Sequence, residues 1–533
     1  MASEETASTN GRSDIQGTLA AYISRLSAPS ARTTTITVLF FVVTLVAYYL
    51  TKGLTTAANA PVRLADAILH GRLDVANGSE LGWIDWAFFE GKYYVLEPPA
   101  MAIVQLPGVL LFGIDLNQTL VSIVIASLAV AAVYRLMAGL TEKLSVQIWM
   151  TVMFGFGTIF WWMSTQGGTW YFAHALSVLF LFVAIHETLV RKRPFAAGFF
   201  LGAAYLSRLP VILSFPFFFI MFSDMWLPEY SWQSLRESIR LGPAAFAKSL
   251  REHVKLQPLV LLGLGVGIPL LFSFVYNYLR FDSPFNTGYS VWADLDGVGL
   301  GQGPKDIMQS GLFSTDYLSR SVTVFFQAVP VFNVSPHNSA APYVYPSWSG
   351  LAFWVTTPAF LYALFAGVKN RLVIIAGAAG LAVSILVLIF AARGLGWFGF
   401  AYDAANVHYW PRLSALNDFL YDFSIYPFLL LAAYGFLVVG LRNKLVLACW
   451  LAIIPIAAVH FLYPITGWPM FGYRYAIDYY PFLFLLTWLG MRDTIKWHHA
   501  LLILAGVVVS GAGVLWINIF DVHSTGGLRW ANW

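Results

Sequence analysis

The chain is built from apolar stretches about as long as a lipid bilayer is thick. Hydrophobic residues make up 58% of its 533 residues, and charged residues only 11%. A soluble domain carries about 25% charged residues, so this composition leaves too little polar surface to cover a water-soluble fold. About 20 consecutive apolar residues cross the hydrocarbon core as one helix. The sequence therefore predicts an all-α polytopic membrane protein.

Thirteen apolar segments are long enough to span a membrane, the shorter ones only when neighbouring helices shield them. They are 34–50, 116–137, 146–163, 170–190, 195–207, 210–222, 259–279, 349–368, 372–391, 425–439, 445–462, 479–489 and 500–520. The split at Arg208-Leu209-Pro210 decides the topology, because one continuous helix there would invert every later segment. We therefore expect about 13 transmembrane helices.

Basic residues between these segments predict the orientation, because lysine and arginine gather in cytoplasmic loops. Arg135 and Lys143 follow the second segment, and Arg191-Lys192-Arg193 follow the fourth. Both groups fall on the side of the N-terminus only if the short apolar stretch 99–113 does not cross. We interpret that stretch as a re-entrant or interfacial helix on the outer face. The expected organisation in the plasma membrane is a cytoplasmic tail at 1–33, a transmembrane domain at 34–533, a first outer loop at 59–115, a cytoplasmic amphipathic segment at 223–257, a large outer loop at 282–348, and an outer C-terminus.

Several function classes lack their sequence signals. The chain has no phosphate-binding P-loop, dinucleotide-binding glycine motif, HExxH motif or G-x-S-x-G motif. The net charge of +4 does not indicate a nucleic-acid partner, because the basic residues lie between apolar segments. The single cysteine, Cys449, lies in an apolar segment and excludes an intrachain disulfide.

Carboxylates are concentrated in the first outer loop, which holds Asp66, Asp74, Glu80, Asp85, Glu90 and Glu97. Acids gathered beside one face of a bilayer indicate a functional region. Val62–Gly71 fits a short amphipathic helix with Arg63, Asp66 and His70 on one face. That face either points into the loop region or is simply solvated at the interface.

Three residues are candidates for proton transfer. Asp85 lies between Trp83 and Trp86, and partial desolvation would raise its pKa and make it a better proton acceptor. Glu97 precedes Pro98-Pro99, which fix the backbone where the chain returns to the bilayer. His174 lies one turn into a predicted span, beside the turn Gly167-Gly168. The alternatives are a wet loop aspartate, a solvated interface glutamate and a hydrogen-bonded core histidine.

Arginine forks match phosphate oxygens, so arginines near the outer side are candidates for binding a phosphate group. They are Arg474, Arg208 and Arg280, together with Arg320 and Arg412. An internal Arg474–Asp478 ion pair is the alternative for the first. Asp294 and Asp296 form a D-x-D that is more typical of a plain turn than of a metal site. No ligand set assigns a metal, and a divalent ion remains open.

Six stretches occur in order along most of the chain. They are RLADAILHGRL, GKYYVLEPPAMAIVQLPGVLLFG, WYFAHALSVLFLFVA, AGFFLGAAYLSRLP, YNYLRFDSPFNTGY and FGYRYAIDYYPFL. Together they resemble the GT-C superfamily of membrane glycosyltransferases that use polyprenyl-phosphate sugars. The resemblance is greatest to the bacterial branch related to protein mannosyltransferases and aminoarabinose transferases. It implies the GT-C fold, with helices and loops at the outer membrane surface that carry the chemistry.

The resemblance implies a sugar transfer from a polyprenyl-phosphate donor to a hydroxyl of a glycan, lipid or protein acceptor. Many relatives carry an acid just before the first interfacial helix, but residues 56–59 of this chain contain none. By similarity to branches with an acid ahead of G-K-Y-Y, Asp85 is then the expected base and Glu97 the second choice. A transporter or flippase of lipid-linked saccharides is the alternative, and it would need charged groups at mid-membrane depth.

Overall fold

The computed structural model describes most of the membrane part of the chain. Its described residues are 30–53, 56, 58–76, 85–223, 237, 240–245, 248, 256–293, 310–332, 344–345, 350–394, 400–403, 408–411, 415–466 and 470–519. Glu80, Trp83, Asp294, Asp296 and Arg412 lie outside them, as does most of the predicted amphipathic segment 223–257.

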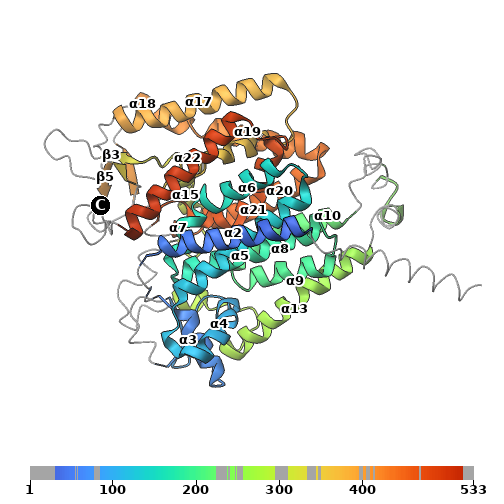
Figure 1. Ribbon diagram of the computed structural model, residues 1–533, viewed down its shortest axis with the longest axis vertical. Helices are drawn as coiled ribbons and strands as arrows, with labels where there is room; N and C mark the ends of the chain where they lie inside the picture. Colours follow the sequence, from blue (N-terminus) through green and yellow to red (C-terminus); the bar gives the residue numbers. More distant parts are fainter. Residues whose placement is uncertain are drawn as a thin grey trace, which may run out of the picture.

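Helices dominate the described residues, as the apolar segments predict (Figure 1). Within the described residues, eight stretches are long and apolar enough to cross a membrane: α2 (Ala31–Leu50), α5 (Gln118–Leu140), α8 (Thr169–Leu189), α13 (Leu256–Phe281), the part Arg371–Ile389 of α17 (Arg371–Gly394), Phe419–Arg442, α20 (Lys444–Phe461) and α22 (Trp497–Val514). The pair α6 (Leu144–Phe156) and α7 (Phe160–Gln166), bent by 47°, makes nine if it counts as one span. These nine stretches correspond to nine of the thirteen predicted segments, which confirms a multi-pass helical membrane protein.

The other four predicted segments form shorter helices, so the count of thirteen stays a prediction. They are α9 (Pro194–Tyr205), η3 (Leu209–Ser214) with α10 (Phe215–Phe222), α16 (Phe353–Thr356) with η7 (Pro358–Phe365), and α21 (Tyr480–Gly490). The predicted break at Arg208 is present, since Arg208 has extended backbone angles between α9 and η3. Pro210 lies two residues further on, and a proline cannot continue the hydrogen-bond ladder of the preceding helix.

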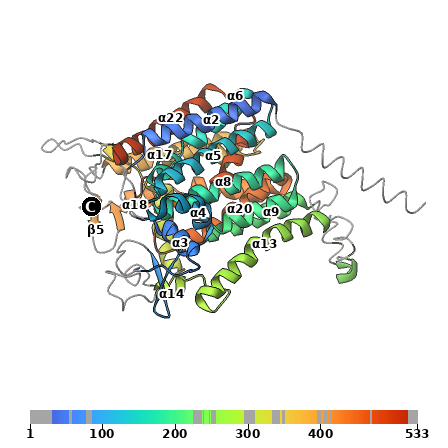
Figure 2. The ribbon, with the colours of Figure 1, turned by 60° about the horizontal axis from the view of Figure 1, so that its bottom comes forward.

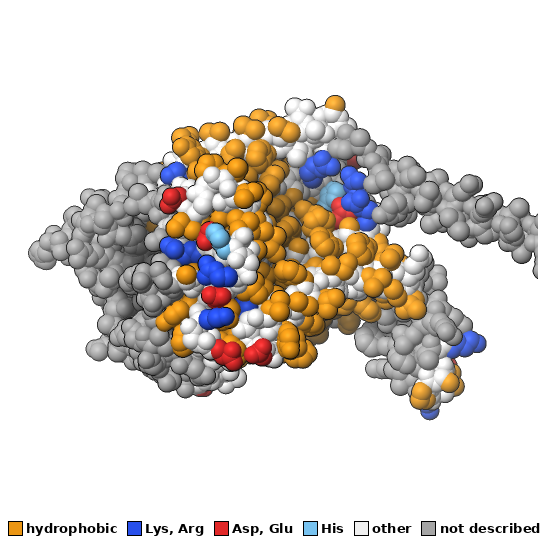
Figure 3. Space-filling view, turned by 90° about the horizontal axis from the view of Figure 1, so that it is seen from below, with side chains coloured by type: hydrophobic (Ala, Val, Ile, Leu, Met, Phe, Trp, Pro, Cys, Tyr) orange, Lys and Arg blue, Asp and Glu red, His pale blue; other side chains and the backbone are white. Residues whose placement is uncertain are grey.

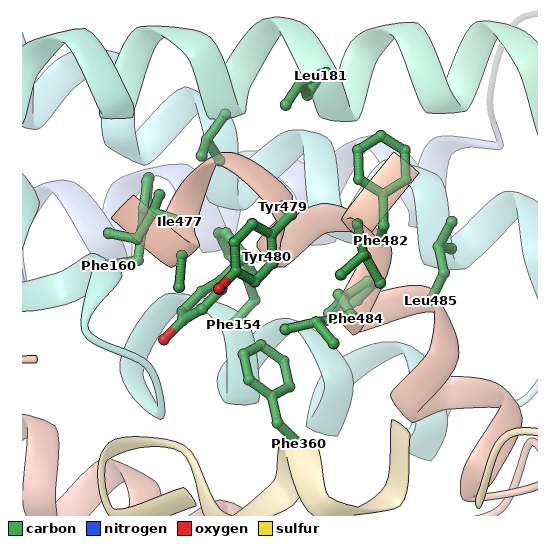
Figure 4. Packing of buried hydrophobic residues seen from close by; sticks show 14 of the residues in the cluster. Phe154, Phe160, Leu181, Phe360, Ile477, Tyr479, Tyr480, Phe482, Phe484 and Leu485 are labelled. Carbon is green, nitrogen blue, oxygen red and sulfur yellow. The ribbon is translucent and has the colours of Figure 1, made fainter. Parts of the chain in front are cut away.

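Helices α5 and α8 lie at the centre of the bundle, whereas α2 and α17 lie at its edge. About 67% of the apolar window of α5 and 72% of that of α8 is buried, against 11% for α2 and 17% for α17. The short helix α21 is packed into this centre, where Phe484 and Tyr480 contact rings from α6 and η7 (Figure 4). Aromatic edge-to-face packing of this kind needs close, fixed neighbours. Although α21 is shorter than a membrane span, its side chains are therefore buried in the core of the bundle.

Basic loops gather at one end of the bundle, which we call the basic end. Lys143 forms an ion pair with Asp493 at 3.1 Å, and Lys444 Nζ donates to the carbonyl of Ser223 at 2.8 Å. Arg492 Nη2 donates to the carbonyl of Val368 at 3.2 Å. These contacts join loops from across the sequence. In Figure 3, charged side chains gather in two zones of the visible face, with a broad hydrophobic band between them.

Short elements occupy the opposite end, which we call the hairpin end. They include α3 (Ala60–Leu69), strands β1 (Trp86–Phe89) and β2 (Lys92–Val95), α4 (Ala100–Phe112) and α14 (Tyr289–Ala293), and α3, α4 and α14 are seen close together in Figure 2. The predicted amphipathic helix is confirmed as α3, with its apolar side buried. The side chain of His70 is 66% exposed, so it points to solvent. The predicted interfacial helix is α4, with Leu111 75% exposed near its C-terminal end.

The remaining described elements are η2 (Gly113–Asp115), η6 (Thr315–Tyr317), α15 (Leu318–Gln327), α18 (Ala415–Phe423), α19 (Tyr426–Tyr434), η8 (Gly435–Val439), η9 (Gly440–Arg442), η10 (Arg474–Tyr479) and η11 (Leu515–Ile519). Strands β3 (Val331–Phe332) and β4 (Val344–Tyr345) form one antiparallel pair, and β5 (Phe400–Asp403) and β6 (His408–Pro411) form another.

Candidate functional site

A β-hairpin brings Asp85 and Glu97 to the same place. Strands β1 and β2 pair antiparallel with Trp86 opposite Val95, so the residues just outside the strands also lie side by side. The two-residue turn Glu90-Gly91 has φ of 49° and 77°. Positive φ at both central residues is typical of the tight turns whose twist matches a hairpin. Two aromatic-rich runs on either side of Glu90-Gly91 were the sequence signal for this hairpin, which our sequence analysis missed.

Asp85 and Glu97 have different surroundings. The indole Nε1 of Trp170 donates to Asp85 Oδ2 at 2.6 Å, a bond that favours the ionised carboxylate. Glu97 is 6% exposed, and its Oε2 accepts no hydrogen bond from a described residue.

Burial raises the pKa of both groups. For Glu97, burial followed by the charge of Asp85 raises the pKa to about 8. Because the charge of Asp85 acts to raise the pKa of Glu97, Glu97 is the member of the pair that keeps its proton to the higher pH. The predicted rise of the Asp85 pKa is confirmed in direction.

Asp478 is the centre of a buried polar cluster. Its Oδ1 accepts from Nδ1 of His174 at 2.7 Å, and its Oδ2 accepts from Nε2 of His460 at 2.9 Å and Nη2 of Arg208 at 3.0 Å. We call Asp478, His174 and His460 the Asp478 cluster. The guanidinium of Arg208 and the hydrogen bonds hold the pKa of Asp478 below its usual range, although burial acts in the other direction. The carboxylate therefore keeps its negative charge to lower pH than an ordinary aspartate.

Arg474 is a buried cation that has no carboxylate partner among the residues that the structure describes. It is 6% exposed and forms no ion pair within the described part of the chain. Its guanidinium carbon lies 5.2 Å from the ring centroids of both Tyr171 and Tyr475, and its Nε has no hydrogen-bond partner among the described residues. Aromatic faces compensate only part of the cost of burying a charge. The arrangement is suited to accepting an external anion.

The carboxylate pair and the two arginines lie within electrostatic reach of one another. The charges of Arg208 and Arg474 act to lower the pKa of Glu97, against the dominant effect of burial. Tyr289 of α14 belongs to the same group, because the charges of Arg208, Glu97 and Asp85 all act on its phenol. One backbone bond also joins the two parts, since the N–H of Ala100 donates to the carbonyl of Leu206 at 3.0 Å.

Arg280 makes several contacts within the protein, and its role in phosphate binding stays a prediction. Its Nη1 donates to the carbonyl of Val95 at 2.8 Å, its Nη2 to Asn277 Oδ1 at 2.9 Å, and its guanidinium carbon lies 3.9 Å from the ring centroid of Tyr276. It is 3% exposed. These contacts attach strand β2, which precedes Glu97, to the C-terminal end of α13.

The sequence candidates Asp85, Glu97, His174, Arg208 and Arg474 thus meet at the hairpin end. The suggested Arg474–Asp478 pair does not form, because Asp478 binds Arg208 instead. Our sequence analysis missed His460 and the central role of Asp478. Both lie in apolar surroundings within the last quarter of the chain, and an isolated charged residue in such a stretch was the available signal. Arg320 donates to the carbonyl of Pro464 and is held there.

No group of three or more histidine, cysteine, aspartate or glutamate side chains suited to a metal ion occurs in the ranges that the structure describes. A scan of protein-family models, a search of curated proteins and a search of solved structures each find no match to this chain.

Proposed function

We propose that the chain is a membrane glycosyltransferase. It would move a sugar from a polyprenyl-phosphate donor to an acceptor hydroxyl of a glycolipid, polysaccharide or protein at the outer face of the plasma membrane. The observation that carries the proposal is the buried Arg474, which has no carboxylate partner among the described residues and stands near Asp85 and Glu97, where burial raises the pKa of Glu97 to about 8. The resemblance of six sequence stretches to the GT-C superfamily names the reaction class.

Arg474 is the proposed site for the donor phosphate. An unpaired buried guanidinium gains most from an anion that brings its own negative charge into the same low-dielectric place. Arg208 adds a second positive charge, and its Nη1 forms no hydrogen bond with a described residue. As the sugar–phosphate bond breaks, negative charge grows on the phosphate oxygen, and both guanidinium groups would stabilise it.

Asp85 is the proposed base. The acceptor hydroxyl oxygen forms a bond to the anomeric carbon, and its proton passes to the Asp85 carboxylate. The bond between the anomeric carbon and the phosphate oxygen breaks, and its electron pair leaves on the polyprenyl phosphate. A carboxylate is a weak base toward a hydroxyl, so proton transfer accompanies the developing oxocarbenium character. Glu97 lies beside Asp85 in its protonated, neutral form, so it adds no second negative charge near the phosphate.

The positions of the charged groups near helix ends favour surface chemistry over transport. His174 is only five residues from the start of α8, and Asp478 precedes the first turn of α21. A flippase of lipid-linked saccharides would need its polar path near mid-membrane. The two functions differ in outcome, because a flippase moves the lipid with its sugar–phosphate bond intact. Release of free polyprenyl phosphate separates them.

The test uses full-length protein in liposomes, a panel of radiolabelled polyprenyl-phosphate sugars and candidate acceptors. We expect transfer that depends on Asp85, with Asp85→Asn lowering kcat by about 10²- to 10⁴-fold, the usual contribution of a positioned base. Asp74→Asn is the matched control, since Asp74 lies in the same loop and its ion pair among the described residues is with Arg72 at 3.7 Å. Full transfer by a folded Asp85→Asn protein would reject the assignment, and flipping without bond cleavage would reject the function.

A further inference from the structure

The Asp478 cluster is not used by the proposed reaction, although it is the most completely buried charged group near the site. Asp478 and His174 are 0% exposed. The carboxylate oxygens accept hydrogen bonds from His174 on α8, His460 on α20 and Arg208 between α9 and η3. Three helices, counting η10 itself, and the link between α9 and η3 therefore meet at this one side chain. Because its oxygens are already occupied by donors, Asp478 is not suited to act as a base.

The first consequence of these contacts is the orientation of Arg208. Nε and Nη2 donate to Asp478 Oδ2 at 3.2 and 3.0 Å, so one edge of the planar fork is fixed side-on. Nη1, on the other edge, forms no hydrogen bond with a described residue, and the side chain is 16% exposed. Because the edge with Nε and Nη2 is fixed and the guanidinium is planar, Nη1 has a defined orientation. Without Asp478 the long side chain would have several rotamers to occupy.

The second consequence is the position of Tyr475. The imidazole of His460 stacks on its ring, with centroids 5.1 Å apart and an interplanar angle of 16°. The same ring lies 5.6 Å from the guanidinium carbon of Arg208 and 5.2 Å from that of Arg474. His460 is in turn bonded to Asp478. The carboxylate therefore orients Arg208 directly and Arg474 through His460 and the ring of Tyr475.

We propose that Asp478, with His174 and His460, is a positioning residue that holds both guanidinium groups for one anionic phosphate. The identity of that anion, a polyprenyl phosphate, rests on the proposed function, whereas the positioning itself follows from the contacts above. Loss of the cluster changes affinity for the phosphate group more than the chemical step, because Asp85 and its Trp170 hydrogen bond are not part of it.

The chain contains a matched control at the basic end. Glu187 is also a buried carboxylate, 5% exposed, with an arginine and a histidine as partners: it accepts from Arg193 Nε and lies 3.5 Å from His186 Nδ1. Glu187→Gln and Asp478→Asn each replace a buried, paired carboxylate by a neutral amide, at opposite ends of the bundle. A merely structural role predicts that both variants lose stability and that neither changes phosphate binding.

The experiment compares purified wild type, Asp478→Asn, Asp478→Glu, His460→Gln and Glu187→Gln. Binding of polyprenyl phosphate alone is titrated, and KM and kcat for sugar transfer are measured separately. We expect Asp478→Asn to weaken phosphate binding and raise KM by about 10- to 100-fold, the loss of one or two charge-assisted hydrogen bonds. His460→Gln should show a smaller effect, Asp478→Glu should recover part of it, and Glu187→Gln should show none.

A second readout needs neither substrate nor activity. Phenylglyoxal modifies accessible arginines, and mass spectrometry locates the products. Arg208 and Arg474 should react several-fold faster in Asp478→Asn than in wild type and should be unchanged in Glu187→Gln. If wild type binds no polyprenyl phosphate, the proposed function fails, and the modification rates still decide the positioning. Equal rates in wild type and a folded Asp478→Asn protein, or equal phosphate affinity in a wild type that binds the lipid, would overturn it.

Discussion

At the scale of the residue, the site is defined by burial of groups that water would otherwise solvate. Glu97 and Arg474 are each 6% exposed, and neither forms an ion pair in the described part of the structure. Such groups cost folding free energy unless a partner or a proton compensates them. Glu97 keeps its proton, which removes the charge. Arg474 cannot lose its charge, so until an anion binds, the charge is stabilised by contacts with aromatic rings.

The raised pKa of Glu97 has a consequence for stability against pH. Between pH 4.5, the ordinary pKa of a glutamate, and about pH 8, the folded protein holds a proton on Glu97 that the unfolded chain releases. Stability therefore falls as pH rises through this interval, by up to about 1.4 kcal/mol per pH unit. Glu97→Gln removes this loss. We expect its unfolding temperature in detergent to match wild type near pH 4.5 and to exceed it at pH 8.5.

Glu90→Gln is the control for that series, because Glu90 is exposed at the tip of the same hairpin. Its unfolding temperature should follow wild type at every pH. An equal loss of stability by Glu97→Gln at pH 4.5 and pH 8.5 would show that the glutamate is ionised in the folded protein.

At the scale of the element, the hairpin of β1 and β2 depends on an anchor. Arg280 donates to the carbonyl of Val95, two residues before Glu97, while packing on Tyr276. A side chain in this role binds the protein itself, so its loss should change the geometry of the acids rather than phosphate affinity.

We predict that Arg280→Gln lowers kcat at least 10-fold, lowers the free energy of unfolding by about 2 kcal/mol and leaves polyprenyl-phosphate affinity within twofold of wild type. Arg474→Gln is the matched comparison and should lose that affinity. Titration with the lipid phosphate separates the two, and a large loss of affinity in Arg280→Gln would restore Arg280 as a phosphate-binding residue.

The crossing of α9 and α13 is a second element whose sequence has a physical reason. The two helices lie side by side in both ribbon views (Figure 1, Figure 2). A Cβ placed on Gly198 would lie 2.2 Å from the carbonyl oxygen of Leu262, and one on Gly265 would lie 2.2 Å from that of Phe195. Small residues that allow close backbone approach are a common basis of helix association in membranes. Helix α9 carries the chain to Arg208.

Gly198→Ala should therefore lower the free energy of unfolding by about 1 to 3 kcal/mol, because the helices must separate. The control is Gly263→Ala on α13, where an added Cβ meets no atom within 4 Å. That change should be neutral or stabilise by up to about 1 kcal/mol through helix propensity. Thermal unfolding of both variants measures the difference, and equal effects would contradict the close crossing.

At the scale of the whole molecule, charge is divided between the two ends of the bundle. The basic end collects lysines and arginines from loops throughout the chain, and the hairpin end holds the acid pair. Because basic loops face the cytoplasm, the hairpin end should face outward.

Cysteine labelling tests this orientation, since the native Cys449 is buried. In intact cells, a membrane-impermeant maleimide should label Glu90→Cys at the hairpin end and should not label Lys369→Cys at the basic end. Both positions are exposed in the structure. Permeabilised cells should label both. Labelling of only Lys369→Cys in intact cells would reverse the orientation.

Much of the architecture follows from local properties that the sequence already contains. Hydropathy and segment length determined the helical class and the eight or nine described stretches able to cross a membrane, because a bilayer selects helices of one length and one polarity. The break at Arg208 was readable because Pro210 acts on its own neighbours. The residue types able to carry protons and bind phosphate were also visible as rare polar residues in an apolar chain.

Only the tertiary structure decided which of these residues are partners. Arg474 and Asp478 are four apart, a spacing that would pair them on an α-helix, but η10 has about three residues per turn and separates them. Asp478 binds Arg208 instead, 270 positions away. The hairpin register likewise brought Asp85 to Glu97, and Arg280 became an anchor once α13 ended beside β2. Pairing between distant segments depends on packing of the whole bundle, which no local pattern specifies.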